Sequence, residues 1–328
     1  MSFQVAIIHS HGSENPAKVI FKVTIALISH PDCALHEMGE HHPEAPTRLD
    51  AIQNQLIASG LDFVLLHHDA PRASRAQLNR VHDSDYVRQV FTRAPAEGRA
   101  WLDPDTCMNP HSLSAALHAA GAVVLGVDLV MSGQAGTAFC NVRPPGHHAE
   151  RDRAMGFCIF NNIAVGAAHA RAAHGLKRVA IVDFDVHHGN GTENIFREEA
   201  NVMFCSTFQH PFYPNTGVAT DSAHIVGVPL AAGANGDAFR AAVAAHWLPK
   251  LDAFAPELVL VSAGFDAHVE DDIADLCLVE KDFAWVTTEI KKIADRHAGG
   301  RIVSSLEGGY ALSALGRSAA AHINALLG

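Results

Sequence analysis

Three side chains suited to metal binding follow one short apolar run in the middle of the chain. Residues 179–182 are apolar and mostly β-branched with no helical period, which predicts a buried strand. Asp183, Asp185 and His187 come next at alternate positions, so an extended chain presents all three on one side. Carboxylate and imidazole groups are typical zinc ligands. The stretch therefore favours a metal site over the simpler alternative, a polar turn closed by the Gly-Asn-Gly sequence that follows.

Reactive groups also follow three other strand-like runs. His147 and His148 follow one run through the proline-rich turn RPPG. Asp266 ends another, where a buried carboxylate needs a cation or a hydrogen-bond donor. Tyr310 comes after a pair of glycines that let a substrate approach the backbone closely. Because the carboxyl ends of parallel strands meet at one edge of a sheet, we expect all of these groups to lie near Asp185.

Two further histidine pairs do not share this context. His41 and His42 lie in a proline-rich loop before a helical pattern, and His67 and His68 precede Asp-Ala-Pro at the end of a strand-like run. We expect local structure for the first pair and an exposed turn for the second. The chain has 23 histidines, and one metal site uses only a few of them.

Composition indicates a soluble globular protein that does not bind nucleic acid directly. The chain has 328 residues, of which 48% are hydrophobic and 18% charged. Its formal charge of −11, from 24 basic and 35 acidic residues without a basic stripe, favours cationic partners over phosphate backbones. No apolar run approaches membrane-span length, and the first residues do not resemble a signal peptide. We therefore expect no membrane contact and a cytoplasmic location.

The six cysteines predict neither a disulfide framework nor a cysteine zinc site. They stand singly, mostly in apolar runs, as buried and reduced thiols do.

Strand-like runs alternate with helical patterns along the chain. This alternation predicts an α/β fold in a single domain, with a central, mostly parallel eight-stranded sheet covered by helices on both faces. We assign residues 1–22 to an N-terminal arm and residues 23–328 to the folded domain. The strand-like runs are 23–29, 63–66, 137–142, 179–182, 202–206, 225–228, 258–262 and 302–306, and the helical patterns are 46–60, 113–133, 162–175, 237–255, 281–299 and 313–327.

Five motifs occur in an order that resembles one enzyme family. RPPGHHA, GFCIFNNIAVG, VDFDVHHGNGT, SAGFDAH and LEGGY are similar to motifs of the zinc-dependent histone deacetylases, which have the arginase-deacetylase fold, and most similar to the class II and bacterial amidohydrolase branch. The resemblance covers residues 23–328. It implies one zinc ion per chain, with Asp185, His187 and Asp266 as its ligands.

The resemblance also implies roles for the polar residues around the zinc ligands. His147 and His148 would form the catalytic dyad, supported by Asp183 and Asn190 respectively, and Tyr310 would donate to the transition state. Asn190 stands where class I members have aspartate, a departure that is expected in class II. Residues 1–22 have no counterpart in the family pattern.

A structural potassium ion and a substrate tunnel are further implications of the resemblance. Phe157 and Tyr213 would be the aromatic walls of the tunnel, the carbonyl of Gly156 would hold the substrate amide, and Ile273 would lie at the entrance. The potassium site would use Asp183, the carbonyls of Asp185 and His187, and Ser206 with Thr207.

The expected reaction is removal of acetyl or other short acyl groups from acylated amines such as acetyl-lysine, with ester hydrolysis as a side activity. Family members that prefer acetylpolyamines carry an acidic residue at the position of Ile273, so this chain is not expected to prefer them. The neighbouring acidic residues Glu270, Asp271, Asp272 and Asp275 would attract a cation only weakly if exposed.

Three alternatives remain at this point. An acetylpolyamine amidohydrolase would share the motifs. A binuclear manganese hydrolase of the arginase kind would need further bridging carboxylates, whereas Val186, His188 and Gly189 surround the first ligands. A non-catalytic binder of acylated ligands would not need His147, His148 and Tyr310 together.

Overall fold

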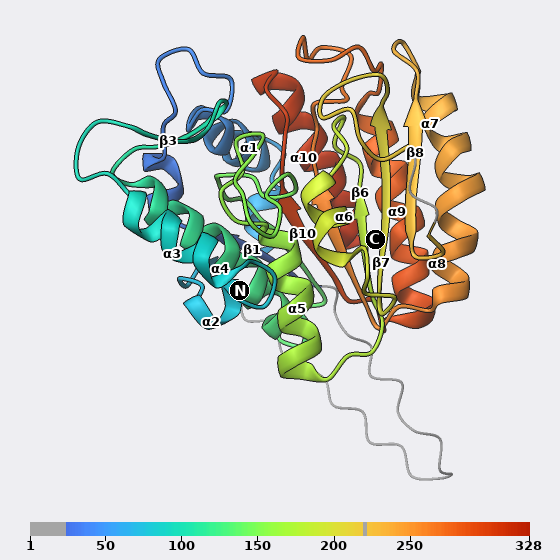
Figure 1. Cartoon of the computed structure of the whole chain (residues 1–328). Helices are drawn as coiled ribbons and strands as arrows, with labels where there is room; N and C mark the ends of the chain where they lie inside the picture. The colour runs from blue at the N-terminus through green and yellow to red at the C-terminus, as the bar shows by residue number, and fades with distance from the viewer. Residues whose placement is uncertain (1–23, 219–221) are drawn as a thin grey trace, which may run out of the picture.

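An eight-stranded parallel sheet forms the centre of the molecule, as predicted (Figure 1). The computed structural model describes residues 24–218 and 222–328, so the predicted arm 1–22 lies outside the described residues. The strand order is β2-β1-β5-β10-β9-β6-β7-β8. In chain order the strands are β1 (Ile25–Ser29), β2 (Leu65–Asp69), β5 (Thr137–Cys140), β6 (Val179–Asp183), β7 (Val202–Gln209), β8 (Ile225–Leu230), β9 (Leu258–Ala263) and β10 (Ile302–Leu306).

The four central strands, β5, β10, β9 and β6, are neighbours in the sheet and are buried along their whole length. Burial on both faces explains why their sequences are mostly apolar, with small Ser and Thr residues, and do not alternate between apolar and charged residues. These four strands are the ones that the reactive segments follow, so the sheet brings four segments distant in sequence to one edge.

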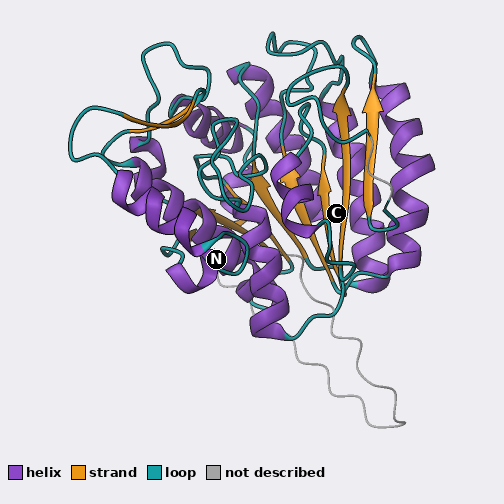
Figure 2. Ribbon diagram, in the orientation of Figure 1, coloured by secondary structure: helices purple, strands orange, loops and turns teal. Residues whose placement is uncertain are grey.

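Helices cover both faces of the sheet (Figure 2). α4 (Ser112–Met131) and α5 (Asn162–His174) pack against each other and against strands of the sheet, while α1 (Thr47–Ala58), α9 (Glu280–His297) and α10 (Leu312–Leu327) form a second packed group. The pattern at 237–255 is divided into α7 (Gly236–Ala242), the π-helical turn Val243–Trp247 and α8 (Leu248–Phe254). The predicted helices therefore exist, with one of them interrupted.

The helix α4 corrects one expectation from composition. It has 20 residues with a mean hydropathy of 1.8, which is long and apolar enough to cross a membrane. In the fold it contacts β1, β5, β10 and α5, and most of its residues are buried inside the protein. The apolar run is thus explained by its place as a core helix between the sheet and α5.

Several short elements were not predicted, and one strand was misplaced. The unpredicted elements are the 3-10 turn Pro31–Leu35, α2 (Arg75–Leu78), α3 (Ser84–Arg93), the hairpin β3 (Ala100–Asp103) with β4 (Thr106–Met108), and α6 (Asn190–Phe196). The run 63–66 begins in the 3-10 turn Leu61–Val64, and β2 continues to Asp69 because its last residues pair with β1. His67 and His68 are therefore part of an edge strand and do not form a turn.

Candidate active site

The reactive segments meet at the carboxyl edge of the four central strands. His147 and His148 follow β5, Asp185 and His187 follow β6, Asp266 follows β9, and Tyr310 follows β10. A cavity of about 230 Å³ is lined by four of them, His147, His148, His187 and Tyr310. The cavity is lined by Asp105, Pro145, His147, His148, Gly156, Phe157, His187, Phe212, Tyr213, Ile273 and Tyr310.

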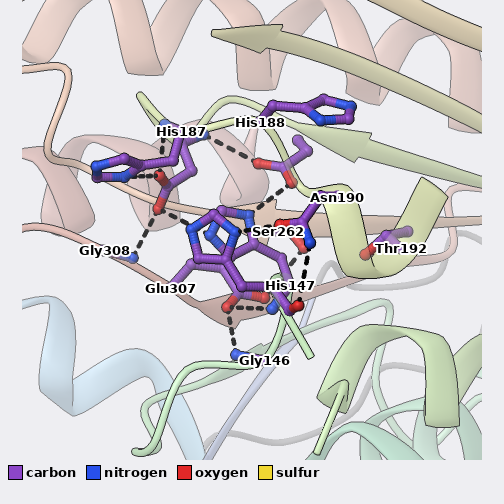
Figure 3. Close-up of polar contacts among 12 residues, drawn as sticks. Gly146, His147, His187, His188, Asn190, Thr192, Ser262, Glu307 and Gly308 are labelled. Atoms are coloured by element: carbon purple, nitrogen blue, oxygen red, sulfur yellow. Dashed lines mark hydrogen bonds and ion pairs between the residues drawn. The ribbon is translucent and has the colours of Figure 1, made fainter. Parts of the chain in front are cut away.

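Asp185, His187 and Asp266 form a compact group of metal-ligating atoms at the base of this cavity. Their donor atoms all lie within 4.8 Å of one another, and all three residues are buried. His187 Nδ1 is 2.9 Å from Asp185 Oδ1 and 3.2 Å from Asp266 Oδ2. Asp185 Oδ2 accepts a hydrogen bond of 2.8 Å from Gly308 N–H (Figure 3). A side chain at Gly308 would place Cβ 2.0 Å from Asp266 Oδ2, so only glycine fits there.

This group fits a divalent cation. Asp266 Oδ2 is buried and has no hydrogen bond of good geometry among the described residues. Burial and the nearby Asp185 carboxylate raise the pKa of Asp266 to about 6, which records the repulsion between two buried acids. Burial opposes protonation of His187, but the adjacent Asp185 and Asp266 carboxylates favour its charged form and raise its pKa to about 9. A cation in place of that proton would satisfy all three side chains.

Two other His/Asp groups among the described residues are less suited to a metal. They are His30 with Asp32 and His118, and Asp128 with His169 and His174. In the first, Arg72 Nε lies 3.2 Å from His118 Nε2, and in the second, Arg80 Nη1 lies 3.1 Å from His169 Nδ1. In each group, the arginine donates to one histidine nitrogen, which is then not available to a metal. Its positive charge also repels a cation.

His147 and His148 are held in different electrostatic environments. His147 Nδ1 lies 2.9 Å from Asp183 Oδ2, and His148 Nδ1 lies 2.7 Å from Asn190 Oδ1. Burial disfavours the charged form of His147, but Asp183 and Asp185 outweigh it and raise its pKa well above the ordinary value. Burial, together with the neighbouring His147 and His187, holds the pKa of His148 well below the ordinary value. Two adjacent imidazoles with separated pKa values are suited to acid and base roles.

Known proteins share this sequence and this architecture. A model of the histone deacetylase domain matches residues 42–326. The chain belongs to the histone deacetylase family. It is 38% identical over 276 residues to a histone deacetylase-like amidohydrolase of Pseudomonas aeruginosa, covering 82% of this chain and 72% of the relative. It is 36% identical over 324 residues to the chloroplastic histone deacetylase 14 of Arabidopsis thaliana, covering 92% of this chain and 77% of that protein.

The fold of this chain is also similar to that of a solved structure. The crystal structure of the HDA15 HD domain matches with a TM-score of 0.88 and 35% sequence identity, covering 93% of this chain and 88% of that one. The chain is therefore a hydrolase of the histone deacetylase family, with the family's single α/β domain.

Glu307 holds the loop that carries the histidine dyad, a role that the sequence did not suggest. Its Oε2 atom accepts hydrogen bonds from the backbone N–H groups of Gly146 (2.6 Å) and His147 (3.1 Å) (Figure 3). Its Oε1 atom accepts from Ser262 Oγ at 3.1 Å. Burial raises the pKa of Glu307 to about 7. The end of β10 thus fixes the position of the segment after β5.

Tyr310 is oriented by two residues that lie far from it in sequence. Asp271 Oδ2 accepts hydrogen bonds from the backbone N–H groups of Tyr310 (2.6 Å) and Ala311 (3.0 Å). The guanidinium of Arg48 lies 5.0 Å from the centre of the Tyr310 ring, and its Nε donates to Gly309 O at 2.6 Å. Asp271 therefore fixes the backbone of the Tyr310 turn, and Arg48 fixes the preceding glycine and packs on the phenol ring.

Arg48 belongs to a buried ionic group that we call the Glu44 cluster, made of His36, Glu44, Arg48 and Arg143. All four side chains are fully buried. Glu44 Oε1 accepts from Arg48 Nη1 at 3.0 Å, and Glu44 Oε2 accepts from Arg143 Nη2 at 2.6 Å. Arg143 is the first residue of the turn that leads to the dyad, so the cluster holds this turn in place.

The aromatic side chains predicted as tunnel walls do line the cavity. The Tyr213 ring meets the rings of His148 and His187 edge-on at 5.3 and 6.0 Å, and Phe157 lies 6.4 Å from Tyr310. Gly156 and Ile273 also line the cavity. Sequence reasoning missed Asp105, Pro145 and Phe212. Asp105 lies in the tip of an unpredicted hairpin, where no periodic pattern marks it.

The remaining predicted residues have these positions. Asp183 is buried at the end of β6 and pairs in the sheet with Ser206, which is buried within β7 next to Thr207. His188 is turned away from the cavity, with Nδ1 2.8 Å from Thr216 Oγ1. His42 accepts the backbone N–H of Glu44, which agrees with a local structural role, and its ring also packs 4.7 Å from Phe157.

In the acidic segment after Asp266, Glu270, Asp272 and Asp275 are exposed, but most of the acids already have partners in the protein. Asp271 is only 4% exposed and is used by the Tyr310 turn. Glu270 is paired with Arg317 at 2.6 Å, and Asp275 Oδ2 accepts from Gln209 Nε2 at 3.2 Å. Three of the four carboxylates already have partners, which further weakens any attraction for a cationic substrate.

Proposed function

We propose that this protein is a zinc-dependent amidohydrolase that removes acetyl or other short acyl groups from acylated amines such as acetyl-lysine. The observation that carries the proposal is the convergence of a three-ligand metal group, two imidazoles and a phenol on one small, largely apolar cavity. Three protein ligands leave open positions on zinc, as in catalytic sites. The proposed tunnel walls are Phe157 and Tyr213.

Asp185, His187 and Asp266 would hold the ion. Bound zinc would supply Lewis-acid polarisation of the acyl carbonyl and of a water molecule. The residues around it carry out the proton transfers. His148, neutral because of its low pKa, accepts a proton from the attacking water. His147, held in its charged form by Asp183, stabilises developing negative charge and supplies a proton to the leaving amine.

Tyr310 would donate its hydroxyl hydrogen to the oxyanion that forms as the carbonyl is attacked. Ester hydrolysis passes through the same tetrahedral species with an easier leaving group, so a carboxylesterase side activity accompanies the proposal. The products are a free amine or alcohol and a short carboxylate.

We also propose a structural potassium ion beside the zinc site, held by Asp183, Ser206, Thr207 and the carbonyls of Asp185 and His187. Ser206 Oγ supports it, because this buried hydroxyl has no hydrogen-bond partner among the described residues. Replacing potassium by a larger organic cation in the buffer should lower thermal stability. An identical melting temperature in both buffers would argue against the site.

The substrate class is tested with purified protein and a panel of acetyl-lysine peptide, N8-acetylspermidine, longer acyl-lysines and short activated esters. We expect kcat/KM for acetyl-lysine peptide to be at least equal to that for the polyamine, because Ile273 offers no counter-charge and the nearby acids are occupied. A preference for the polyamine above about tenfold that persists at high salt would instead support an acetylpolyamine amidohydrolase. Binding without turnover of any substrate would support a non-catalytic binder.

We also propose a cytoplasmic location, because the first residues do not resemble a signal peptide. All six cysteines are free, and five of them are buried, which agrees with a reducing compartment.

A further inference from the structure

The orientation of the Asn190 amide decides which nitrogen of His148 is able to accept a proton. Asn190 Oδ1 lies 2.7 Å from His148 Nδ1. A neutral imidazole carries hydrogen on one nitrogen, and the other nitrogen is an acceptor. With the amide oxygen towards His148, Nδ1 carries the hydrogen and Nε2 is the acceptor. With the amide rotated by half a turn, its NH2 group would donate to Nδ1, and Nε2 would carry the hydrogen.

Asparagine at position 190 does not make this choice by itself. A carboxylate presents only acceptors to an imidazole, whereas the two ends of an amide are similar in shape and opposite in hydrogen-bonding character. Asn190 is buried, so its contacts with the rest of the protein have to select one orientation.

The contacts of Asn190 Nδ2 select the orientation. Nδ2 lies 2.7 Å from Glu150 Oε1, 3.4 Å from the carbonyl oxygen of His148 and 3.3 Å from Met155 Sδ. The carboxylate and the carbonyl only accept hydrogen bonds, and a thioether sulfur is a weak acceptor. All three groups therefore require NH2 at this end of the amide, and the short bond to the carboxylate is the strongest of the three.

Glu150 is itself held beside the amide by contacts with two other residues. Its Oε1 also accepts from Arg153 Nη2 at 2.9 Å, and its backbone N–H donates to Arg153 O at 3.0 Å. Its carbonyl oxygen lies 2.8 Å from His82 Nδ1. The Glu150 side chain is 12% exposed, and it does not line the cavity. The carboxylate is thus fixed outside the cavity, where it contacts Asn190 and does not meet a bound substrate.

We propose that Glu150 is a positioning residue that sets the tautomer of His148 by fixing the orientation of the Asn190 amide. With Glu150 in place, neutral His148 carries its hydrogen on Nδ1, and Nε2 is the nitrogen that accepts a proton from the attacking water. This inference rests on the proposed deacylase function and adds the residue that prepares its base.

The first test reverses the hydrogen-bonding character of residue 150. Glu150→Lys places a donor beside the amide, so the amide should rotate, His148 should lose its free Nε2, and kcat for acetyl-lysine peptide should fall by about tenfold or more. Glu150→Gln keeps an oxygen that accepts from Asn190 and Arg153, so its loss should be within about twofold. Equal kcat values for these two variants, at equal zinc content, would overturn the proposal.

Arg153→Gln is the matched control, because it removes the other partner of Glu150 Oε1 and leaves the contact with Asn190. Its side chain is 61% exposed. The kcat of this variant should equal that of the wild type. A loss as large as that of Glu150→Lys would show that the ion pair with Arg153, and not the orientation of the amide, is what matters.

The Asn190→Asp background separates orientation of the amide from a general structural role of Glu150. A carboxylate at position 190 accepts in either orientation, so it needs no orienting partner, and it repels Glu150. Adding Glu150→Lys to Asn190→Asp should therefore leave kcat no lower than that of Asn190→Asp alone. If Glu150→Lys lowered kcat by the same factor in both backgrounds, Glu150 would have a structural role only, and the proposal would be wrong.

Nitrogen-15 NMR of the zinc-loaded protein reports the tautomer directly, with the His148 signals assigned by comparison with His148→Gln. We expect hydrogen on Nδ1 in the wild type and in Glu150→Gln, and hydrogen on Nε2 in Glu150→Lys. Hydrogen on Nε2 in the wild type would contradict the proposal.

If Glu150→Lys does not fold, Glu150→Met takes its place, because it removes the acceptor and adds no charge. This variant should show both tautomers, and a spectrum identical to that of the wild type would refute the role of Glu150. Absence of any turnover by the wild-type protein would refute the deacylase function. Wild-type turnover with hydrogen on Nδ1 in every variant would refute only the role of Glu150.

Discussion

Two buried charged groups lie within the same domain, and they differ in how fully their charges are satisfied. In the Glu44 cluster, two arginines donate to one carboxylate and also to backbone carbonyls. Burial opposes ionisation of Glu44, but Arg143 and Arg48 outweigh it and lower the pKa of Glu44 to about 2. In the group of Asp185, His187 and Asp266, carboxylates face each other and one oxygen has no hydrogen bond of good geometry. The carboxylate of the first group is paired with two arginines and, within the described part of the chain, only His36 Nε2 lacks a hydrogen bond, whereas the second group has more carboxylates than cations to pair with them.

The comparison shows how burial serves two purposes. A buried ion pair with every donor and acceptor used stabilises the fold only as long as all partners are present. A buried group with surplus negative charge is unfavourable alone and gains its free energy when a cation binds. The four predictions below change one of these groups, or a residue that depends on them.

The largest effect is expected when a metal ligand is removed. Asp266→Ala leaves two ligands, which cannot close the site, so bound zinc and turnover should both be lost. The loss should exceed the roughly 10–100-fold that follows removal of even an outer-shell partner. The metal-free variant should unfold at a temperature close to that of the metal-free wild type, because it loses both the repulsion between Asp266 and Asp185 and the hydrogen bond that Asp266 Oδ1 accepts from Val186 N–H.

Metal analysis and calorimetry check this prediction, with His187→Ala as the parallel variant. Near-stoichiometric zinc and normal turnover in either protein would show that these residues are not the ligands.

Breaking the Glu44 cluster should instead destabilise the fold. Glu44→Gln leaves Arg48 and Arg143 without their counter-charge, which should lower the free energy of unfolding by about 3–5 kcal/mol. Because the folded-state pKa of Glu44 is lowered, its contribution to stability is present above pH 4.5 and is lost as the pH falls towards 2.

Denaturant titrations of the wild type and Glu44→Gln at several pH values measure both effects. The difference between the two proteins should shrink as the pH falls through this window. A difference that stays constant down to pH 2 would mean that the charge of Glu44 is not what stabilises the cluster.

Tyr310 depends on both groups, since Arg48 holds its turn and its side chain lines the same cavity as His187. Tyr310→Phe should lower kcat by about a hundredfold to a thousandfold while zinc content and inhibitor affinity stay near the wild-type values, because an oxyanion donor acts in the transition state. Steady-state kinetics with metal analysis test this. An effect mainly on KM would make Tyr310 a substrate-binding wall.

The smallest expected change is a shift in pH dependence. Asn190→Asp places a carboxylate 2.7 Å from His148 Nδ1, which favours the charged imidazole and raises the pKa of His148. The base is then neutral only at higher pH, so the acid limb of the kcat/KM profile should move upwards. An unaltered profile, with wild-type metal content, would show that the pair does not set this titration.

Much of this architecture was readable in the sequence, for a physical reason. Strands buried on both faces are mostly apolar, so the runs at β6, β9 and β10 stand out, and each ends within a residue or so of its predicted limit. Parallel strands bring their carboxyl ends to one edge, which is why Asp185 and Asp266 could be expected together. The family motifs could be recognised from the order of residues, without any information on side-chain contacts.

The tertiary structure alone decided what supports and limits the site. Asp105 lies in a hairpin tip, Asp271 in an acidic stretch and Glu44 in a proline-rich loop, and none of the three has a periodic signal. Their roles arise from contacts across long sequence separations: 51 residues between Asp105 and Gly156, 39 between Asp271 and Tyr310, and 99 between Glu44 and Arg143. From the sequence, a carboxylate in a loop is expected to be solvated. Only the packing of the fold determines whether it is exposed, paired with buried donors or placed beside a cavity.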